Sequence, residues 1–242
     1  MVALSVRWWC RSKFQYKATM ARFNKLEVLN VLSGQGMIPL FYNGDVELCK
    51  KVLTAVYEGG ARILEFTNRG DFAYEVFGEL NKFCEQELPE MILGIGSVTD
   101  AGTAALYMQV GANFIVSASY REDMAIACNR RKVPYMPGCG TLTEIGTAEQ
   151  MGCDIVKLFP GSVYGPGFVK GVLAPQPWTN IMPTGGVVPT EENLKGWFDA
   201  GVTCVGMGSK LIGKDVLASG DFAGLEKKTR ETLKLIERLR KK

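Results

Sequence analysis

A lysine stands in the middle of a short apolar run, Ile155-Val156-Lys157-Leu158-Phe159. Pro160-Gly161 follows the run, which is typical of a short strand buried on both faces in a parallel sheet. Because side chains alternate along a strand, Lys157 shares a face with Ile155 and Phe159. Burial lowers the pKa of an amine and leaves more of it as the neutral nucleophile that attacks carbonyls. In the alternative interpretation the ammonium reaches past the strand end or pairs with a carboxylate.

A second apolar run, Ile63-Leu64-Glu65-Phe66-Thr67, carries an acid at its centre, and Arg69 follows it. Lys157 and an inward-facing Glu65 are the minimum for imine chemistry, in which the lysine attacks a ketone and the glutamate shuttles protons during carbon–carbon cleavage. This reaction requires neither a metal nor an organic cofactor. Alternatively, Glu65 forms a buried salt bridge to Lys157 or Arg69. Arg69 itself is either a clamp for a substrate carboxylate or an ordinary arginine at the rim.

The composition excludes several other kinds of chemistry. The 242 residues include no histidine, which removes Ser-His-Asp and Cys-His mechanisms and the usual zinc ligands. The seven cysteines are scattered without a C-x-x-C pair, a pattern typical of a reduced, cytoplasmic protein without a metal site. A net charge of +3 does not argue for nucleic acid. The sequence contains no run of eighteen apolar residues, so no membrane span is predicted.

Eight short apolar segments alternate with amphipathic helical patterns from about residue 20 onward. This alternation predicts a parallel sheet, and eight units in this length fit a closed (β/α)8 TIM barrel in a single domain, residues 20–242. The alternative is an open doubly wound sheet, but no G-x-G-x-x-G follows the first strand. The predicted strands are 37–40, 61–66, 91–93, 114–117, 133–136, 155–159, 181–184 and 204–207, and the predicted helices are 25–33, 45–58, 72–83, 100–110, 122–131, 143–151, 191–200 and 222–239.

Residues 1–19 differ from the rest, because basic residues alternate with Trp8, Trp9, Phe14 and Tyr16. The segment lacks the long apolar core and the cleavage site of a signal peptide. It could contact an anionic surface or nucleic acid. The simpler interpretation is a poorly ordered, dispensable extension, with Met20 as the functional start.

Glycine-rich turns follow the last two predicted strands, at Gly185-Gly186 and Gly208-Ser209. Exposed backbone N–H groups beside helix N-termini suit a phosphate, and many barrels build their phosphate site from these two loops. Glycine pairs are also common as plain turns. Only the two turns together therefore predict a phosphate site.

These segments, in their order and spacing, resemble the 2-keto-3-deoxy-6-phosphogluconate (KDPG) / 4-hydroxy-2-oxoglutarate aldolases, a family of class I aldolases. The resemblance covers about 20–213. It rests on Met37-Ile38-Pro39-Leu40, Gly59-Gly60-Ala61-Arg62-Ile63-Leu64-Glu65-Phe66-Thr67-Asn68-Arg69, Gly94-Ile95-Gly96-Ser97-Val98, Gly111-Ala112-Asn113-Phe114-Ile115-Val116-Ser117, Val133-Pro134-Tyr135-Met136-Pro137-Gly138, Asp154-Ile155-Val156-Lys157-Leu158-Phe159-Pro160 and Pro183-Thr184-Gly185-Gly186-Val187.

The resemblance implies a cytoplasmic (β/α)8 barrel, usually a homotrimer, that splits a 2-keto-3-deoxy sugar acid into pyruvate and an aldehyde. It implies that Lys157 is the Schiff-base lysine and Glu65 the proton shuttle. No cofactor, metal, nucleic acid or membrane is implied. The implied substrate contacts are Arg69, Ser97 and Thr184 around the pyruvyl group, Gly185, Gly186 and Ser209 around the phosphate of KDPG, and Phe159.

Several positions depart from the family pattern and put the identity of the substrate in doubt. Ser97 stands where threonine is usual, and Thr99-Asp100-Ala101 replaces Leu-Asn-Pro. Asn68-Arg69-Gly70-Asp71 replaces a more common Leu-Arg-Thr run, and no proline follows Ser117. A paralogue that cleaves 4-hydroxy-2-oxoglutarate or another 2-keto acid would show such changes. Two further alternatives are a catalytically silent barrel acting as an assembly scaffold and a phosphosugar isomerase that forms no imine.

Overall fold

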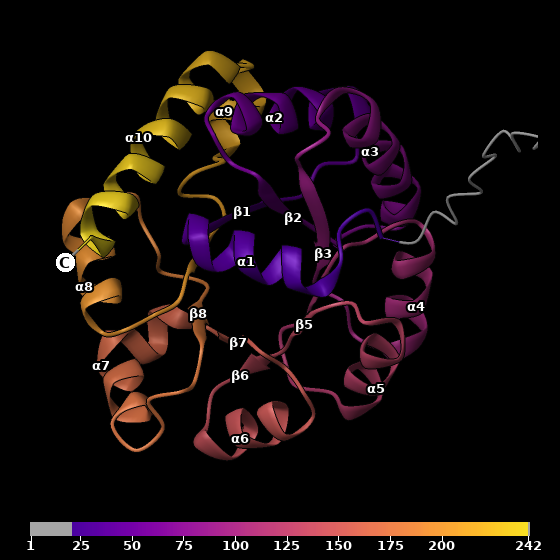
Figure 1. Cartoon of the computed structure of the whole chain (residues 1–242). Coiled ribbons are helices and arrows are strands. Elements are labelled where there is room, and N and C mark those ends of the chain that lie inside the picture. Colours follow the sequence, from indigo (N-terminus) through magenta and orange to yellow (C-terminus); the bar gives the residue numbers. More distant parts are fainter. Residues whose placement is uncertain (1–20, 242) are drawn as a thin grey trace, which may run out of the picture.

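The computed structural model describes residues 21–241, so the predicted extension, residues 1–19, and the proposed start at Met20 lie outside the described part. Within residues 21–241, strands and helices alternate along the chain as the sequence predicts. The helices form a ring around the strands (Figure 1). No helix in this part of the chain is long and apolar enough to cross a membrane.

All strand pairings in the described residues are parallel, in a six-stranded sheet of order β5-β4-β3-β2-β1-β9 and a three-stranded sheet of order β6-β7-β8. Only Pro137 separates β5 from β6, because proline has no N–H to donate to a ladder. A single bridge, Thr184 to Gly206, links the end of β8 to β9. The strands are thus curled into at least half a barrel. Their bounds are β1 Met37–Phe41, β2 Ile63–Thr67, β3 Ile92–Gly96, β4 Ile115–Val116, β5 Tyr135–Met136, β6 Gly138–Cys139, β7 Val156–Leu158, β8 Ile181–Pro183 and β9 Val205–Met207.

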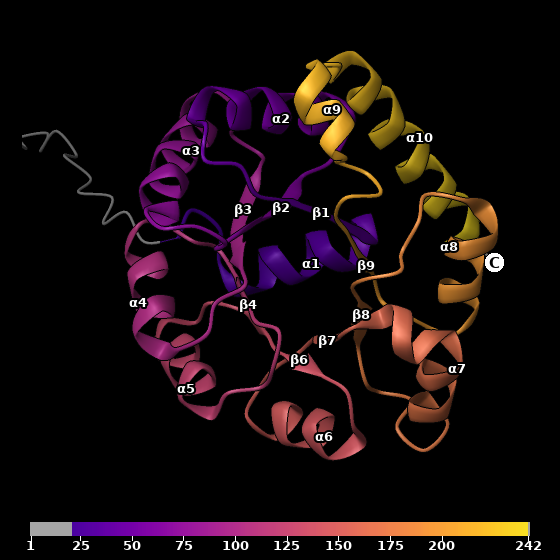
Figure 2. The same cartoon turned by 180° about the vertical axis from the view of Figure 1, so that it is seen from behind.

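The helix α1 differs from the others because it crosses the inside of the ring (Figure 2). Its Val28 and Leu32 are fully buried in an inner core with residues from the starts of the strands, such as Ile38 and Ile63. It therefore covers the N-terminal ends of the strands and leaves their C-terminal ends open. The helices are α1 Lys25–Gln35, α2 Val46–Glu58, α3 Ala73–Glu87, α4 Ala101–Gln109, α5 Glu122–Arg131, α6 Leu142–Gln150, α7 Gly161–Leu173, α8 Glu191–Asp199, α9 Lys214–Ser219 and α10 Phe222–Arg240.

A second, outer core lies between the strands and the surrounding helices. Along β2, Leu64 and Phe66 belong to this outer core, whereas Ile63 belongs to the inner one. The predicted alternation is therefore confirmed, and Glu65 and Thr67 share the inward face with Ile63.

Besides the split between β5 and β6 and shifts of element bounds, three helices differ from the sequence prediction. α1 continues past Gly34 and ends at Gly36, whose φ of 74° is left-handed and whose N–H bonds Leu32 O. Two helices, α7 and α9, had no predicted counterpart. α7 is hidden in the sequence because it contains Pro166 and is interrupted at Gly165, with φ 67° and ψ 175°.

Candidate active site

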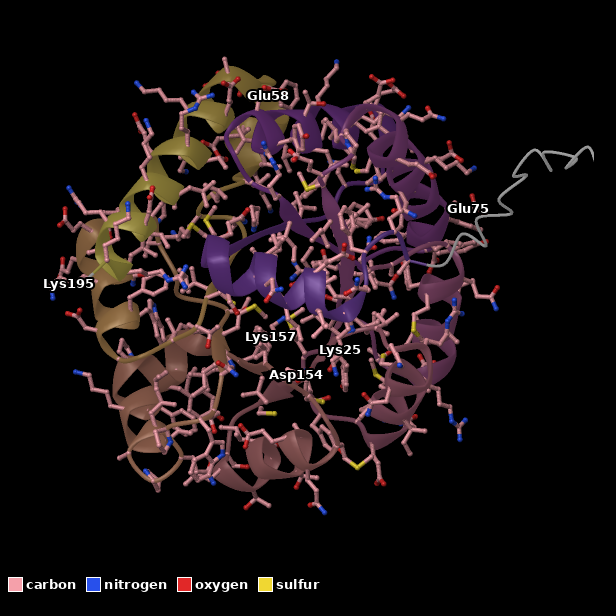
Figure 3. The ribbon with its side chains drawn as sticks, viewed as in Figure 1. Lys25, Glu58, Glu75, Asp154, Lys157 and Lys195 are labelled. Atoms are coloured by element: carbon pink, nitrogen blue, oxygen red, sulfur yellow. The ribbon has the colours of Figure 1, made fainter. Side chains whose placement is uncertain are left out.

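Lys157 occupies the centre of β7, paired in register with Gly138 of β6 and Met182 of β8. Its side chain is 6% exposed and lies in the middle of the ring (Figure 3). The ammonium is 5.1 Å from the centroid of the Phe159 ring. Within residues 21–241 it forms neither a hydrogen bond nor an ion pair. The amine is thus held in a largely apolar interior and is available to a ligand.

The segment before β7 fixes the strand to α1. Asp154 forms a salt bridge of 2.7 Å with Lys25 of α1, near the N-terminal start of β7 (Figure 3). Lys157 lies further along the chain, on the side facing the open C-terminal ends. The ion pair and the amine are therefore separate, and Asp154 does not neutralise Lys157.

Glu65 reaches the interior from β2, opposite Gly94 of β3. It is 1% exposed, and its Oε2 has no hydrogen-bond partner in the described part of the chain. Burial raises the pKa of the Glu65 carboxyl, while the charges of Lys157 and Arg69 oppose this by lowering it. A carboxyl with these opposing influences can both accept and donate a proton, which suits acid–base chemistry.

A cavity of about 360 Å³ opens at the C-terminal ends of β1, β2, β8 and β9. Six of the predicted site residues line it, whereas Lys157, Glu65 and Ser97 do not. Two lining residues connect it to the buried pair: Phe159, whose ring contacts Lys157, and Thr67, which shares a strand face with Glu65. The six predicted residues on the cavity wall are Arg69, Phe159, Thr184, Gly185, Gly186 and Ser209.

Arg69 and Thr184 are two of the polar side chains on the cavity wall that have no partner within residues 21–241. Arg69 is exposed and forms no ion pair there. Thr184 is 6% exposed, and its hydroxyl lacks a hydrogen bond. A Cβ at Gly206 would lie 2.3 Å from Thr184 Oγ1, so the glycine leaves room for this hydroxyl. Both groups are free to bind an anionic or hydroxylated ligand.

Ser97 is the one predicted substrate contact that the cavity does not include. It follows β3 with a φ of 59°, a left-handed conformation that serine rarely adopts. The residue is half-buried, and its neighbour Val98 continues the pairing through a hydrogen bond from its N–H to Val116 O.

The turn Gly185-Gly186 requires glycine at both positions, where φ is 88° and 76°. A Cβ at Gly186 would also lie 2.8 Å from Ser162 Cα at the start of α7. The turn is therefore packed tightly against α7 on one side and presents its backbone to the cavity on the other.

The cavity wall also contains residues that the sequence reasoning did not select: Tyr42 after β1, and Lys210 and Lys214 after β9. The two lysines lie close to the predicted site residue Ser209 in the sequence, and this proximity could have pointed to them. They were missed because only the folded loop shows which side of it faces the cavity.

Other reactive groups are not arranged for chemistry. The six cysteines in the described chain are buried and free, and burial raises the pKa of each thiol to about 12. Such thiols are poor nucleophiles at neutral pH. Among residues 21–241, no group of three or more Cys, Asp or Glu side chains could hold a metal ion.

Comparison with known proteins finds relatives over most of the chain. Residues 28–228 match the family model of the KDPG and KHG aldolases. The chain is 28% identical over 214 residues to the 2-dehydro-3-deoxy-phosphogluconate aldolase of Dickeya dadantii, covering 86% of this chain and 96% of that protein. It is 28% identical over 211 residues to the KHG/KDPG aldolase of Escherichia coli K12, with the same two coverages. A solved KDPG aldolase from Legionella pneumophila, with pyruvate captured as a covalent carbinolamine, has a TM-score of 0.76 at 23% identity, covering 84% of this chain and 96% of the other.

Proposed function

The chain belongs to the KDPG and KHG aldolase family, and from this premise we propose that it is a class I aldolase acting on a 2-keto-3-deoxy sugar acid. KDPG is the proposed substrate, and pyruvate and glyceraldehyde 3-phosphate are the proposed products. The observation that carries the proposal is the buried Lys157 amine, which has no hydrogen bond or ion pair within residues 21–241 and whose charge lowers the pKa of the buried Glu65. The alternative substrate within the same family is 4-hydroxy-2-oxoglutarate.

Imine formation uses both buried groups. The neutral Lys157 amine attacks the C2 carbonyl, and the carbonyl oxygen takes a proton to give a carbinolamine. Glu65 then donates a proton to this hydroxyl, which leaves as water, and the C2–N bond becomes a protonated imine. Burial raises the pKa of the Glu65 carboxyl, which favours the protonated form needed for this step.

Carbon–carbon cleavage reverses the role of Glu65. Its carboxylate removes the proton from the C4 hydroxyl, the C3–C4 bond breaks, and the electron pair moves to the imine nitrogen to give an enamine and a free aldehyde. Glu65 returns the proton to C3, and hydrolysis of the imine releases pyruvate and the Lys157 amine. The protonated imine is the electron sink.

The cavity supplies the proposed substrate contacts. Arg69 lies close enough to influence Glu65, and it would bind the carboxylate beside the keto carbon, with Thr184 and Ser97 on the adjacent oxygens. The Gly185-Gly186 turn and Ser209 would bind the phosphate through backbone N–H groups and a hydroxyl. Phe159 would pack against the substrate beside the reacting carbon.

The architecture is proposed to be one catalytic domain with a closed (β/α)8 barrel. The bridge between Thr184 and Gly206 and the interruption of a single strand at Pro137 support this closure. A homotrimer located in the cytoplasm is proposed from the family resemblance. The exposed apolar side chains of Val163, at 75%, and Leu142, at 46%, lie near the open end and are candidates for a subunit contact.

Borohydride reduction in the presence of pyruvate tests the proposal. Reduction should fix pyruvate to the protein as a secondary amine, and peptide mass spectrometry should locate it on Lys157. Catalysed release of pyruvate from KDPG, followed with lactate dehydrogenase, tests the substrate. A folded protein that forms no adduct would overturn the aldolase mechanism and favour a scaffold or a non-imine barrel.

A further inference from the structure

Three cationic side chains line the cavity, and none of the acidic side chains in residues 21–241 does. They are Arg69, after β2, and Lys210 and Lys214, after β9. All three are exposed and form no ion pair or side-chain hydrogen bond within the described chain. A hollow surrounded by unpaired cations concentrates anions. The proposed function gives Arg69 a partner, the substrate carboxylate. It gives no partner to Lys210 or Lys214.

The two lysines follow β9, whereas Arg69 follows β2, and β1 lies between these two strands in the sheet. The charge of Arg69 lowers the pKa of Glu65, whereas neither Lys210 nor Lys214 has such an effect. The cavity wall includes Thr184 and Gly206, whose bridge joins the end of β8 to β9, and the loop after β9 that carries the lysines. A ligand that spans this cavity can therefore meet Arg69 on the β2 side of β1 and the lysine pair on the β9 side.

The loop after β9 is built to hold its lysines at the rim. The N–H groups of Leu211 and Ile212 both donate to Gly208 O, at 2.8 and 2.9 Å, and form a tight turn. Leu211 and Ile212 are buried, which anchors the turn in the outer core. Lys210 precedes this buried pair and Lys214 begins α9 just after it, so the anchor fixes the backbone of both lysines while their side chains stay exposed.

We propose that Lys210 and Lys214 are specificity-determining residues that bind the substrate end distal to the keto group and select a phosphate dianion there. The inference rests on the proposed function and names the substrate class of the same site. Two ammonium groups complement a group with two negative charges. The Gly185-Gly186 turn supplies uncharged donors to the same group. A shorter 2-keto acid that ends in a carboxylate, such as 4-hydroxy-2-oxoglutarate, gains less because it carries one charge and does not extend to the rim.

The test compares two substrates in the double variant Lys210→Met/Lys214→Met. Both lysines are exposed, so the variant should fold normally. For KDPG, kcat/KM should fall by roughly tenfold or more, mainly through KM, because two exposed charge contacts are lost. For 4-hydroxy-2-oxoglutarate the loss should be much smaller. Inorganic phosphate should inhibit the unmodified enzyme competitively and the double variant more weakly.

Lys170→Met provides the matched control, since Lys170 is an exposed lysine of α7 that does not line the cavity. This variant also replaces a lysine by methionine, and kcat/KM for both substrates should be unchanged. An equal loss for both substrates in the double variant, or no loss for KDPG, would overturn the role of the two lysines. Pyruvate has no distal anion, so its borohydride-stable adduct does not depend on the two lysines. Absence of this adduct in the unmodified protein would therefore overturn the proposed function, not the role of the lysines.

Discussion

Glu65 on β2 lies directly over Gly96 on β3: a Cβ at Gly96 would be 1.7 Å from Glu65 Oε1. In the sheet Gly96 pairs with Thr67, whereas Glu65 pairs with Gly94. The carboxylate therefore leans along the neighbouring strand, toward the C-terminal ends where the cavity opens. The missing side chain at residue 96 leaves the space in which the Glu65 carboxylate is held.

The variant Gly96→Ala tests this relationship. The new methyl must displace the carboxylate, so kcat should fall by roughly tenfold or more while the fold is retained, because small misplacements of catalytic groups are costly. Steady-state pyruvate release and circular dichroism measure both. The control is Gly78→Ala on α3, where a Cβ meets no atom within 4 Å. It should keep full activity and gain about 0.5–1 kcal/mol of stability. Full activity in Gly96→Ala would mean that the position of the carboxylate does not matter.

Replacing Lys157 separates the nucleophile from its charge. Lys157→Ala removes both, and Lys157→Arg keeps a positive charge near Glu65 while removing the attacking amine. Both variants should release pyruvate at the background rate and give no adduct on borohydride reduction. An adduct that persists on another lysine would show that Lys157 is not the Schiff-base residue.

Glu65→Gln is expected to lower kcat by roughly a hundredfold or more, the usual scale for losing a general acid–base group. The amide is similar in size, so the variant should fold. Stopped assays with KDPG at neutral pH measure the loss, and an unchanged rate would remove Glu65 from the mechanism.

Glu65 should also affect how stability depends on pH. Burial raises the pKa of its carboxyl above the ordinary value of 4.5, so the folded state holds a proton that the unfolded state has released. Over this window the folded state binds more protons, and the free energy of unfolding falls as pH rises from about the unfolded pKa through the folded one. The Glu65→Gln variant lacks this pH dependence of the free energy of unfolding. Its stability relative to the unmodified protein, measured by urea unfolding, should increase with pH across the window, and a constant difference would contradict the raised pKa.

Thr184→Val tests a hydroxyl that has no hydrogen bond within residues 21–241. Because no described partner is lost, thermal stability should be unchanged or slightly higher. If the hydroxyl binds the pyruvyl group, kcat/KM should fall by about tenfold, the scale of one lost hydrogen bond to a charged group. Thr229→Val serves as a comparison, since the buried Thr229 hydroxyl bonds Leu225 O at 2.8 Å. It should lose stability and keep activity, and the reverse pattern would contradict the assignment.

The parallel sheet and the strand faces that Lys157 and Glu65 share with their neighbours were predictable from the sequence alone. A run such as Ile63-Leu64-Glu65-Phe66-Thr67 has a period of two, and this period fixes which side chains share a face. Helix starts such as the Asp45 cap of α2 were equally readable, because capping depends on residues close in the chain. Local patterns determine local structure, and the parallel arrangement then follows from the alternation of elements.

The tertiary structure decided which residues far apart in the sequence lie close together. It placed Gly96 under Glu65, left Thr184 without a described partner, and put Lys210 and Lys214 on the cavity wall while leaving Ser97 off it. No local sequence pattern predicts these relationships, because each depends on how separate strands and loops pack at the C-terminal ends. The sequence thus determined the chemical groups and the faces they occupy, and only the packing of distant segments decided their partners and their access to the cavity.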